Sequence, residues 1–99
     1  MKELKITESD YGKEFLEALE NVLEIRKKKR IVYGDAFMCD DMLFLKYQIE
    51  NKIKRFNAQI ISGELIDTNE NSETAKDSCI DIVNYSLFLI AKMNRGDRK

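Results

Sequence analysis

The sequence has no histidine, no proline and no tryptophan, and it contains only two cysteines, Cys39 and Cys79. Because histidine is missing and the cysteines are not in a CxxC spacing, zinc sites and imidazole acid–base chemistry are excluded, and any metal should be a hard cation bound by oxygen. Both thiols are expected to be inert, with Cys79 as a small buried apolar side chain. The missing proline and the high share of charged residues, 35%, favour long helices.

Long apolar segments are also missing. No run approaches the roughly 18 residues of a membrane span, and the first ten residues, MKELKITESD, contain no apolar core of a signal peptide. We therefore expect a cytoplasmic protein without a membrane partner. The net charge of −1 likewise gives no electrostatic reason to expect a nucleic-acid partner.

With 99 residues, the chain is long enough for one hydrophobic core. We expect a single helical domain, 1–99, with frayed ends at about 1–8 and 94–99. Domains of this size are marginally stable alone, so a homo-oligomer, either a dimer or a tetramer, is expected. The expected fold class is all-α, with three long helices per chain in an antiparallel bundle that oligomerisation completes.

Apolar side chains at three- and four-residue steps predict these helices. The first follows the capping side chains of Thr7, Ser9 and Asp10 and ends in the basic run 26–30. An ordered loop is expected at 33–35, before a second helix over about 40–62 that Gly63 terminates. A polar stretch, 63–72, leads to a third helix over about 73–93, with residue 71 or 72 as its cap. The apolar stripe of the second helix comprises Met42, Leu45, Ile49, Ile53, Phe56 and Ile60.

Three polar residues share one face of the third predicted helix, which is otherwise largely apolar. On a 3.6-residue period, Asp77, Asp81 and Asn84 lie within roughly 60° of one another. A buried carboxylate is costly unless a cation, a hydrogen-bond network or a metal compensates its charge. The sequence therefore predicts a site here, with a divalent metal as the simplest compensation. The structural alternative is a polar network with lysine or arginine side chains of other helices.

Other candidate residues have structural alternatives as well. Glu50 lies at the edge of the second apolar stripe, where it contributes either to a site or to an ion pair with Lys46 or Lys54 four residues away. The basic run 27–30 either contacts phosphate or complements the helix dipole. Residues 33–35 either contact a ligand or only connect two helices.

Three segments appear in an order and at a spacing that resemble a known family. They are residues 26–35 (RKKKRIVYGD), residues 49–55 (IENKIKR), and the pattern Asp77-x-x-x-Asp81-x-x-Asn84-Tyr85. Over about 23–93, the chain resembles the nucleotide-modification-associated domain family of phages and bacteria. That family is itself similar to the MazG-like all-α nucleoside triphosphate pyrophosphohydrolases. The last of the three patterns is the most specific.

The resemblance implies a helical bundle of two or more chains, in which acidic side chains of adjacent helices hold Mg²⁺, or Mn²⁺, against the phosphates of an NTP or dNTP. By this resemblance, Glu50, Asp77 and Asp81 are the metal ligands and the catalytic residues. The implied nucleotide-binding residues are Lys27, Tyr33, Lys52, Arg55 and Asn84.

The sequence departs from the MazG-like pattern, in which an E-x-x-E pair on one helix faces an E-x-x-D pair on the next. Asp77 and Asp81 stand for the second pair with a four-residue step, whereas Glu50 is the only acid near the first. The expected function is Mg²⁺-dependent hydrolysis of a (deoxy)nucleoside triphosphate to its monophosphate, in nucleotide metabolism or modification. The missing acid favours the alternative, a helical bundle protein that binds a nucleotide or a partner without hydrolysing it.

Overall fold

The computed structural model describes residues 4–63 and 74–98, and all regular structure in these ranges is helical. A short helix, α1 (Glu8–Tyr11), precedes three long helices, α2 (Lys13–Tyr33), α3 (Met42–Ser62) and α4 (Ala75–Arg95). A 3₁₀ turn, η1 (Ala36–Cys39), connects α2 to α3. The prediction of an all-α fold is confirmed. None of the helices in the described ranges has the length and apolarity that crossing a membrane requires.

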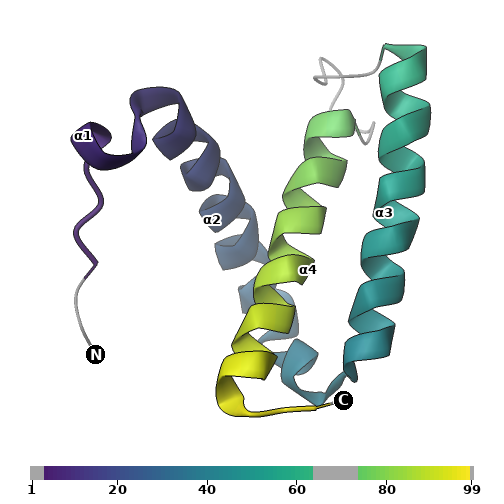
Figure 1. The fold of residues 1–99 in the computed structure, drawn as a ribbon. Coiled ribbons are helices and arrows are strands. Elements are labelled where there is room, and N and C mark those ends of the chain that lie inside the picture. The colour runs from purple at the N-terminus through teal and green to yellow at the C-terminus, as the bar shows by residue number, and fades with distance from the viewer. Residues whose placement is uncertain (1–3, 64–73, 99) are drawn as a thin grey trace.

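Two of the long helices, α3 and α4, lie side by side and run in opposite directions (Figure 1). The C-terminal part of the third long helix, α2, crosses behind α4 (Figure 1). The N-terminal half of α2 diverges from α4, so the two helices form a V (Figure 1). α2 contacts α4 less extensively than α3 does. This arrangement leaves one side of α4 covered by α3 and another only partly covered by α2.

The first helical segment differs from the prediction at both ends. Thr7 caps the separate short helix α1. Gly12, with φ of 88°, ends α1 and separates it from α2. At its C-terminal end α2 continues to Tyr33, which is helical and not part of a loop as predicted. The helix ends there because Gly34 has φ of 58°, a value that residues with a Cβ atom rarely adopt.

The second and third long helices agree more closely with the prediction. Asp41 caps α3 by accepting a hydrogen bond of 2.8 Å from the Phe44 amide, and Gly63 ends it as expected. α4 begins after Thr74 and extends to Arg95, two residues beyond the predicted end. Its cap is therefore Thr74, whereas the predicted caps at 71 and 72 lie outside the described residues, as does nearly all of the 63–72 stretch.

The buried core is small and partly polar. Within the described ranges, the buried apolar side chains are Val22, Leu45, Ala75 and Ile80. The α3–α4 interface also contains a buried hydrogen bond of 2.7 Å, which the Ser78 hydroxyl donates to the side-chain oxygen of Gln59. The core therefore depends on polar pairing as well as on apolar contact.

Several predicted core positions are exposed. Ile53 and Ile60 of the α3 stripe are 43% and 47% exposed. Cys79, predicted to be buried, is also exposed. The reason is geometric, since the helical period places apolar residues on several sides of α3 and α4 but only one partner helix packs closely against each.

The turn η1 is fastened to the end of α4. Lys92 Nζ and Arg95 Nη2 both donate hydrogen bonds to the Met38 carbonyl, at 3.2 and 3.0 Å. Lys92 is buried and forms an ion pair of 3.0 Å with Asp97. Hydrogen bonds from Arg95 and Lys92 lower the pKa of Asp97 from 3.8 to about 2. These contacts fix η1 beside α4, where its side chains reach the candidate site.

Candidate functional site

The Asp81 carboxylate lies between the other two long helices and joins them to α4. Its Oδ1 atom is 3.0 Å from Lys29 Nζ on α2, and its Oδ2 atom is 2.9 Å from Lys52 Nζ on α3. The Asp81 side chain is only 13% exposed, so both ion pairs lie at the junction of the helices. These two ion pairs correspond to the structural alternative in the sequence analysis, a polar network with lysine side chains of other helices in place of a metal.

Asp77, the other acid of the predicted pair, has a local role in helix capping. Its Oδ2 atom accepts hydrogen bonds of 3.0 Å from both the backbone amide and the hydroxyl of Thr74. The Thr74 hydroxyl in turn accepts a hydrogen bond from the Asp77 amide, which completes a capping box. One carboxylate oxygen of Asp77 is therefore already used to start α4.

Asn84, the third predicted polar residue, is buried, and its side-chain nitrogen has no hydrogen-bond partner. A buried amide nitrogen without an acceptor destabilises the fold by about 1–3 kcal/mol. Asn84 lines a pocket between α4, η1, α2 and α3, but its side-chain nitrogen is itself buried, so an acceptor in this pocket reaches the nitrogen only after the Asn84 side chain turns.

Five aromatic side chains line this pocket, which has a volume of about 340 Å³: Tyr33, Phe37, Phe44, Tyr85 and Phe88. We call it the aromatic pocket. The rings of Phe37 and Phe88 are stacked with their centroids 4.2 Å apart, and Tyr85 meets Phe88 edge-on at 5.8 Å. A pocket of this volume has room for a small organic molecule, and its aromatic lining suits a flat ring.

A fixed positive charge forms part of the wall of the aromatic pocket. The guanidinium of Arg26 lies over the rings of Phe37 and Phe88, with its Cζ atom 5.4 and 5.0 Å from their centroids. Asp35 holds this guanidinium through an Nη2–Oδ1 contact of 2.9 Å. The hydrogen bond from Arg30 is the main cause that lowers the pKa of Asp35. Burial opposes it, and the charges of Arg30 and Arg26 together with the hydrogen bond from Arg26 lower the pKa further. The Asp35 carboxylate is therefore ionised at neutral pH and keeps Arg26 in place.

A second pocket, of about 320 Å³, adjoins the first. We call it the charged pocket, because its polar lining consists of Lys29, Lys52, Asp77 and Asp81. Lys29 and Asp81 line both pockets. A ligand could therefore place a ring among the aromatic side chains and an anionic group beside the two lysines.

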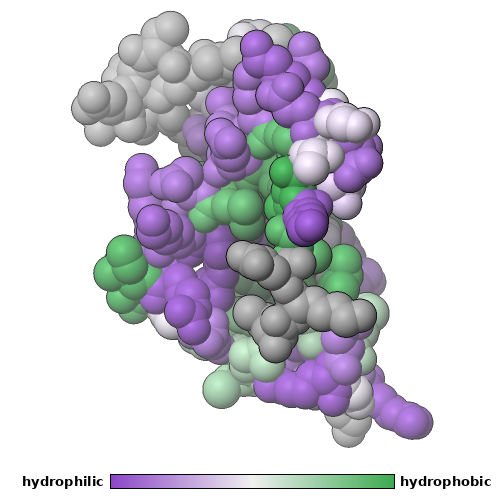
Figure 2. Space-filling model, turned by 90° about the vertical axis from the view of Figure 1, so that its left-hand side faces the viewer, coloured by the Kyte–Doolittle hydropathy of each residue, from purple (hydrophilic) through white to green (hydrophobic). Residues whose placement is uncertain are grey.

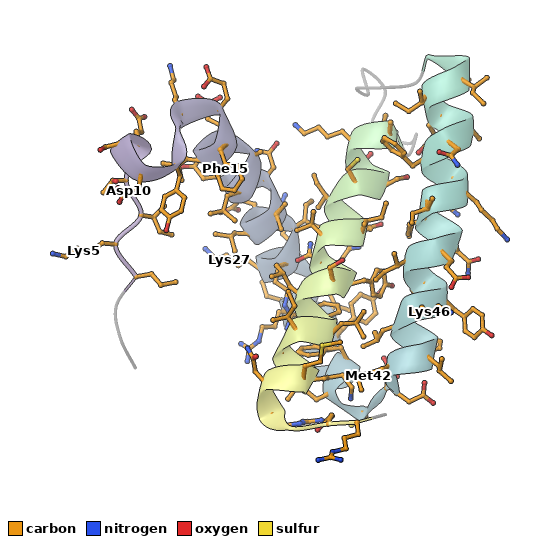
Figure 3. All side chains as sticks on the ribbon, viewed as in Figure 1. Lys5, Asp10, Phe15, Lys27, Met42 and Lys46 are labelled. Atoms are coloured by element: carbon orange, nitrogen blue, oxygen red, sulfur yellow. The ribbon has the colours of Figure 1, made fainter. Side chains whose placement is uncertain are left out.

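Three of the remaining predicted site residues, Glu50, Lys27 and Arg55, line neither pocket. Glu50 pairs with Lys46 at 3.2 Å, the four-residue ion pair that was the structural alternative for this residue. Lys27 is exposed and points away from α4 (Figure 3). Arg55 is exposed on α3 and lines neither pocket, although it makes contacts elsewhere. Tyr33, in contrast, lines the aromatic pocket.

The predicted metal ligands are not grouped. Across residues 4–63 and 74–98, no three acidic or cysteine side chains lie close enough together to hold a metal ion. Both Asp81 oxygens contact lysines and one Asp77 oxygen caps α4, so these carboxylates do not fit Mg²⁺ as they are placed. Metal binding at Glu50, Asp77 and Asp81 stays a prediction, and it requires that these contacts rearrange.

Sequence reasoning missed Arg26, Phe37 and Phe88, and it included Lys29 only as a member of the basic run 27–30. A signal for Arg26 and Lys29 was present, because they and Tyr33 follow the buried Val22 at helical spacing and therefore lie on the same side of α2. Phe37 and Phe88 gave no such signal, since their stacking depends on how η1 folds against α4.

Comparison with known proteins gives no relative. The chain matches no protein-family model, no curated protein and no solved structure. The resemblance to MazG-like proteins therefore stays at the level of the three sequence segments.

Proposed function

We propose that this protein binds a nucleotide across the two adjoining pockets. The observation that carries the proposal is that Lys29 and Asp81 line both of them. Nucleotides combine a flat ring with an anionic phosphate chain, and this pair of pockets offers aromatic side chains next to lysines. The resemblance of the sequence to nucleotide-processing proteins supports the same ligand class.

The base occupies the aromatic pocket in this proposal. Tyr33, which is 68% exposed, is available to stack on a ring, and the Arg26 guanidinium is fixed above the neighbouring phenylalanines. Asn84 lines the same pocket, and when its side chain turns toward the ligand, its unpaired nitrogen donates a hydrogen bond to an acceptor such as a ring nitrogen, a carbonyl or a sugar oxygen.

The phosphates lie in the charged pocket and contact Lys29 and Lys52. In the free protein both lysines pair with Asp81, so the phosphate must compete with this carboxylate. Lys29 is the more accessible of the two, with 53% of its side chain exposed against 19% for Lys52. We therefore expect Lys29 to turn toward phosphate first, because its release from Asp81 is cheaper.

A second candidate is Mg²⁺-dependent hydrolysis of an NTP or dNTP to the monophosphate. Its support is that Asp77 and Asp81 line the same charged pocket, next to the lysines. For this activity the Asp81 carboxylate would have to exchange its lysine partners for the metal, and the lysines would then hold the phosphates. Assembly into a homo-oligomer, as the resemblance implies, is part of both candidates.

Titration calorimetry tests the first candidate with each NTP and dNTP in EDTA, and then with Mg²⁺. We expect saturable binding in EDTA of at least one nucleotide, and weaker binding of its nucleoside and of inorganic triphosphate, because each of these occupies one pocket only. The absence of binding by every nucleotide, with and without Mg²⁺, from a protein that is folded by circular dichroism would refute the proposal. Pyrophosphate release in the Mg²⁺ experiment would select the second candidate.

Two neighbouring lysines provide a matched control. Lys29→Ala removes an amine that lines both pockets, whereas Lys28→Ala removes an equal charge from an exposed position that lines neither of them. We expect affinity to fall about tenfold for Lys29→Ala, equivalent to ~1.4 kcal/mol, and to stay within a factor of two for Lys28→Ala. Equal effects of the two variants would mean that only the net charge matters.

A further inference from the structure

One acid in the wall of the aromatic pocket has no role in the nucleotide site as described above. Asp40 directly follows η1, is partly buried, and lines this pocket but not the charged pocket. Over residues 4–63 and 74–98, its side chain forms no hydrogen bond and no ion pair. Asp81, the second acid that lines the aromatic pocket, uses both of its oxygens for lysines. Asp40 is therefore the acid whose oxygens are available to a ligand in this pocket.

Apolar surface by itself does not set the aromatic pocket apart. Figure 2 shows hydrophobic side chains open to solvent among hydrophilic ones on the side of the molecule where α1 lies. Tyr11 of α1 and Phe15 of α2 are exposed as well. What distinguishes the aromatic pocket is a carboxylate without a partner among its rings, and such polar groups determine which flat ring a pocket accepts.

A ligand in the aromatic pocket changes the surroundings of Asp40. Partial burial already removes some of the water that solvates its carboxylate, and a bound ring would remove more. A ring that donates hydrogen bonds to the carboxylate replaces this water, whereas a ring that offers only lone pairs leaves the charge without a partner. Asp40 therefore favours a ligand with N–H or O–H groups at its position.

The position of Asp40 indicates which part of a nucleotide it meets. The sugar joins the base to the phosphates, so in the proposed site it lies where the two pockets adjoin, near Lys29 and Asp81. Asp40 lines the aromatic pocket alone. It therefore faces the base, on an edge that points away from the sugar.

We propose that Asp40 binds the Watson–Crick edge of guanine, an inference that rests on the proposed nucleotide site and names its ligand as a guanine nucleotide. Guanine presents two N–H donors side by side, at N1 and at the 2-amino group, and the two oxygens of one carboxylate accept both. Adenine and cytosine place an amino group beside a ring nitrogen that carries a lone pair. Uracil and thymine place their single N–H between two carbonyl oxygens. In each of these bases a lone pair faces the carboxylate and opposes binding.

Base analogues test this assignment on the wild-type protein. Titration calorimetry compares GTP, dGTP, inosine triphosphate, xanthosine triphosphate and ATP in EDTA, or in Mg²⁺ if binding requires the metal. Inosine triphosphate differs from GTP only by the missing 2-amino group, so we expect it to bind about tenfold more weakly, and ATP and xanthosine triphosphate more weakly still. Affinity for dGTP should stay within about a factor of three of that for GTP, because Asp40 does not contact the sugar.

Replacement of Asp40 by asparagine should change the preferred base. The amide offers one acceptor and one donor, which match the N1–H and the 2-carbonyl of xanthine. We expect Asp40→Asn to bind GTP about tenfold more weakly and to prefer xanthosine triphosphate over GTP. A purely structural role of Asp40 would not reverse this order.

The neighbouring acid provides the matched control. Asp41 lines neither the aromatic nor the charged pocket, and it caps α3, a role that asparagine fills equally well. Asp41→Asn therefore removes the same charge one residue away and should keep the wild-type order of bases.

The outcomes separate this inference from the proposed function. Failure of every nucleotide to bind refutes the nucleotide site and the role of Asp40 with it. Binding without a preference for guanine, or a preference that Asp40→Asn leaves unchanged, would overturn the role of Asp40 and leave the nucleotide site standing. Binding that depends on the ribose 2′-hydroxyl but not on the base has the same meaning, because Asp40 would then contact the sugar.

Discussion

Replacement of Asp81 by asparagine distinguishes the two candidate functions most sharply. The substitution keeps the shape of the side chain but removes the charge that pairs with Lys29 at 3.0 Å and with Lys52 at 2.9 Å. In the binding proposal, Asp81 competes with phosphate for these two lysines. In the hydrolysis proposal, it is a metal ligand. The two roles predict opposite effects on nucleotide affinity.

The effect on stability follows from the exposure of the two ion pairs. The pair with Lys29 is half exposed on the lysine side, so its loss costs at most ~1 kcal/mol. The pair with Lys52 is more shielded, with exposures of 13% and 19%, and its loss costs about 1–2 kcal/mol. Together they amount to about 2 kcal/mol, which in a domain of this size lowers Tm by roughly 10 °C.

The effect on binding follows from Coulomb repulsion. A unit charge about 4 Å from another contributes about 1 kcal/mol even at the dielectric constant of water. Removing the Asp81 charge from beside a bound phosphate should therefore tighten nucleotide binding in EDTA about fivefold, with a larger effect where the pocket excludes water. The variant is thus expected to be less stable but to bind its ligand more tightly.

Calorimetry in EDTA and thermal unfolding by circular dichroism measure both effects. Glu24→Gln is the matched control, because it removes one negative charge from an exposed position on α2 and should change neither quantity measurably. Weaker nucleotide binding by Asp81→Asn in EDTA would refute the view that Asp81 competes with phosphate. Binding that needs Mg²⁺ and disappears in Asp81→Asn would instead establish the carboxylate as a metal ligand.

Three further predictions concern the fold. Ser78→Ala removes the donor of the buried hydrogen bond to Gln59 and should lower the free energy of unfolding by about 1–3 kcal/mol in urea titrations, whereas no change would mean that water replaces it. Thr74→Ala removes the cap of α4 and should cost about 1 kcal/mol by the same measurement, with an unchanged midpoint as the contrary result. The pKa of Asp97 is lowered from 3.8 to about 2 in the folded chain, so its contribution is present above pH 3.8 and is lost as the pH falls toward 2. The difference in Tm between wild type and Asp97→Asn should accordingly shrink over this interval, and a difference independent of pH would contradict the assignment.

The helices could be predicted because their signals are local. Apolar spacing identified all three long helices, and the glycine at 63 marked the end of α3. The errors lie where the end of a helix depends on side chains from elsewhere. Tyr33 was assigned to a loop because the contacts of Arg26 and Arg30 with Asp35, which hold the end of α2, are not visible in a pattern of apolar residues.

The site was predicted in part. The grouping of Asp77, Asp81 and Asn84 on one side of α4 was correct, since helical period alone determines it. The partners of these residues were not determined by the sequence. Asp77 bonds to its own helix start, Asp81 bonds to two lysines from different helices, and Asn84 is left without a partner.

The sequence by itself therefore determined which residues are helical, where most of the helices start and stop, and that polar groups would share one side of the last helix, because each of these depends on neighbours within a few positions. Only the tertiary structure decided that α2 diverges from α4, that Phe37 stacks on Phe88, and that Cys79 is exposed. These features depend on how rigid helices cross one another and on which of several apolar sides each helix buries. That choice is made by packing between distant segments, and no local pattern records it.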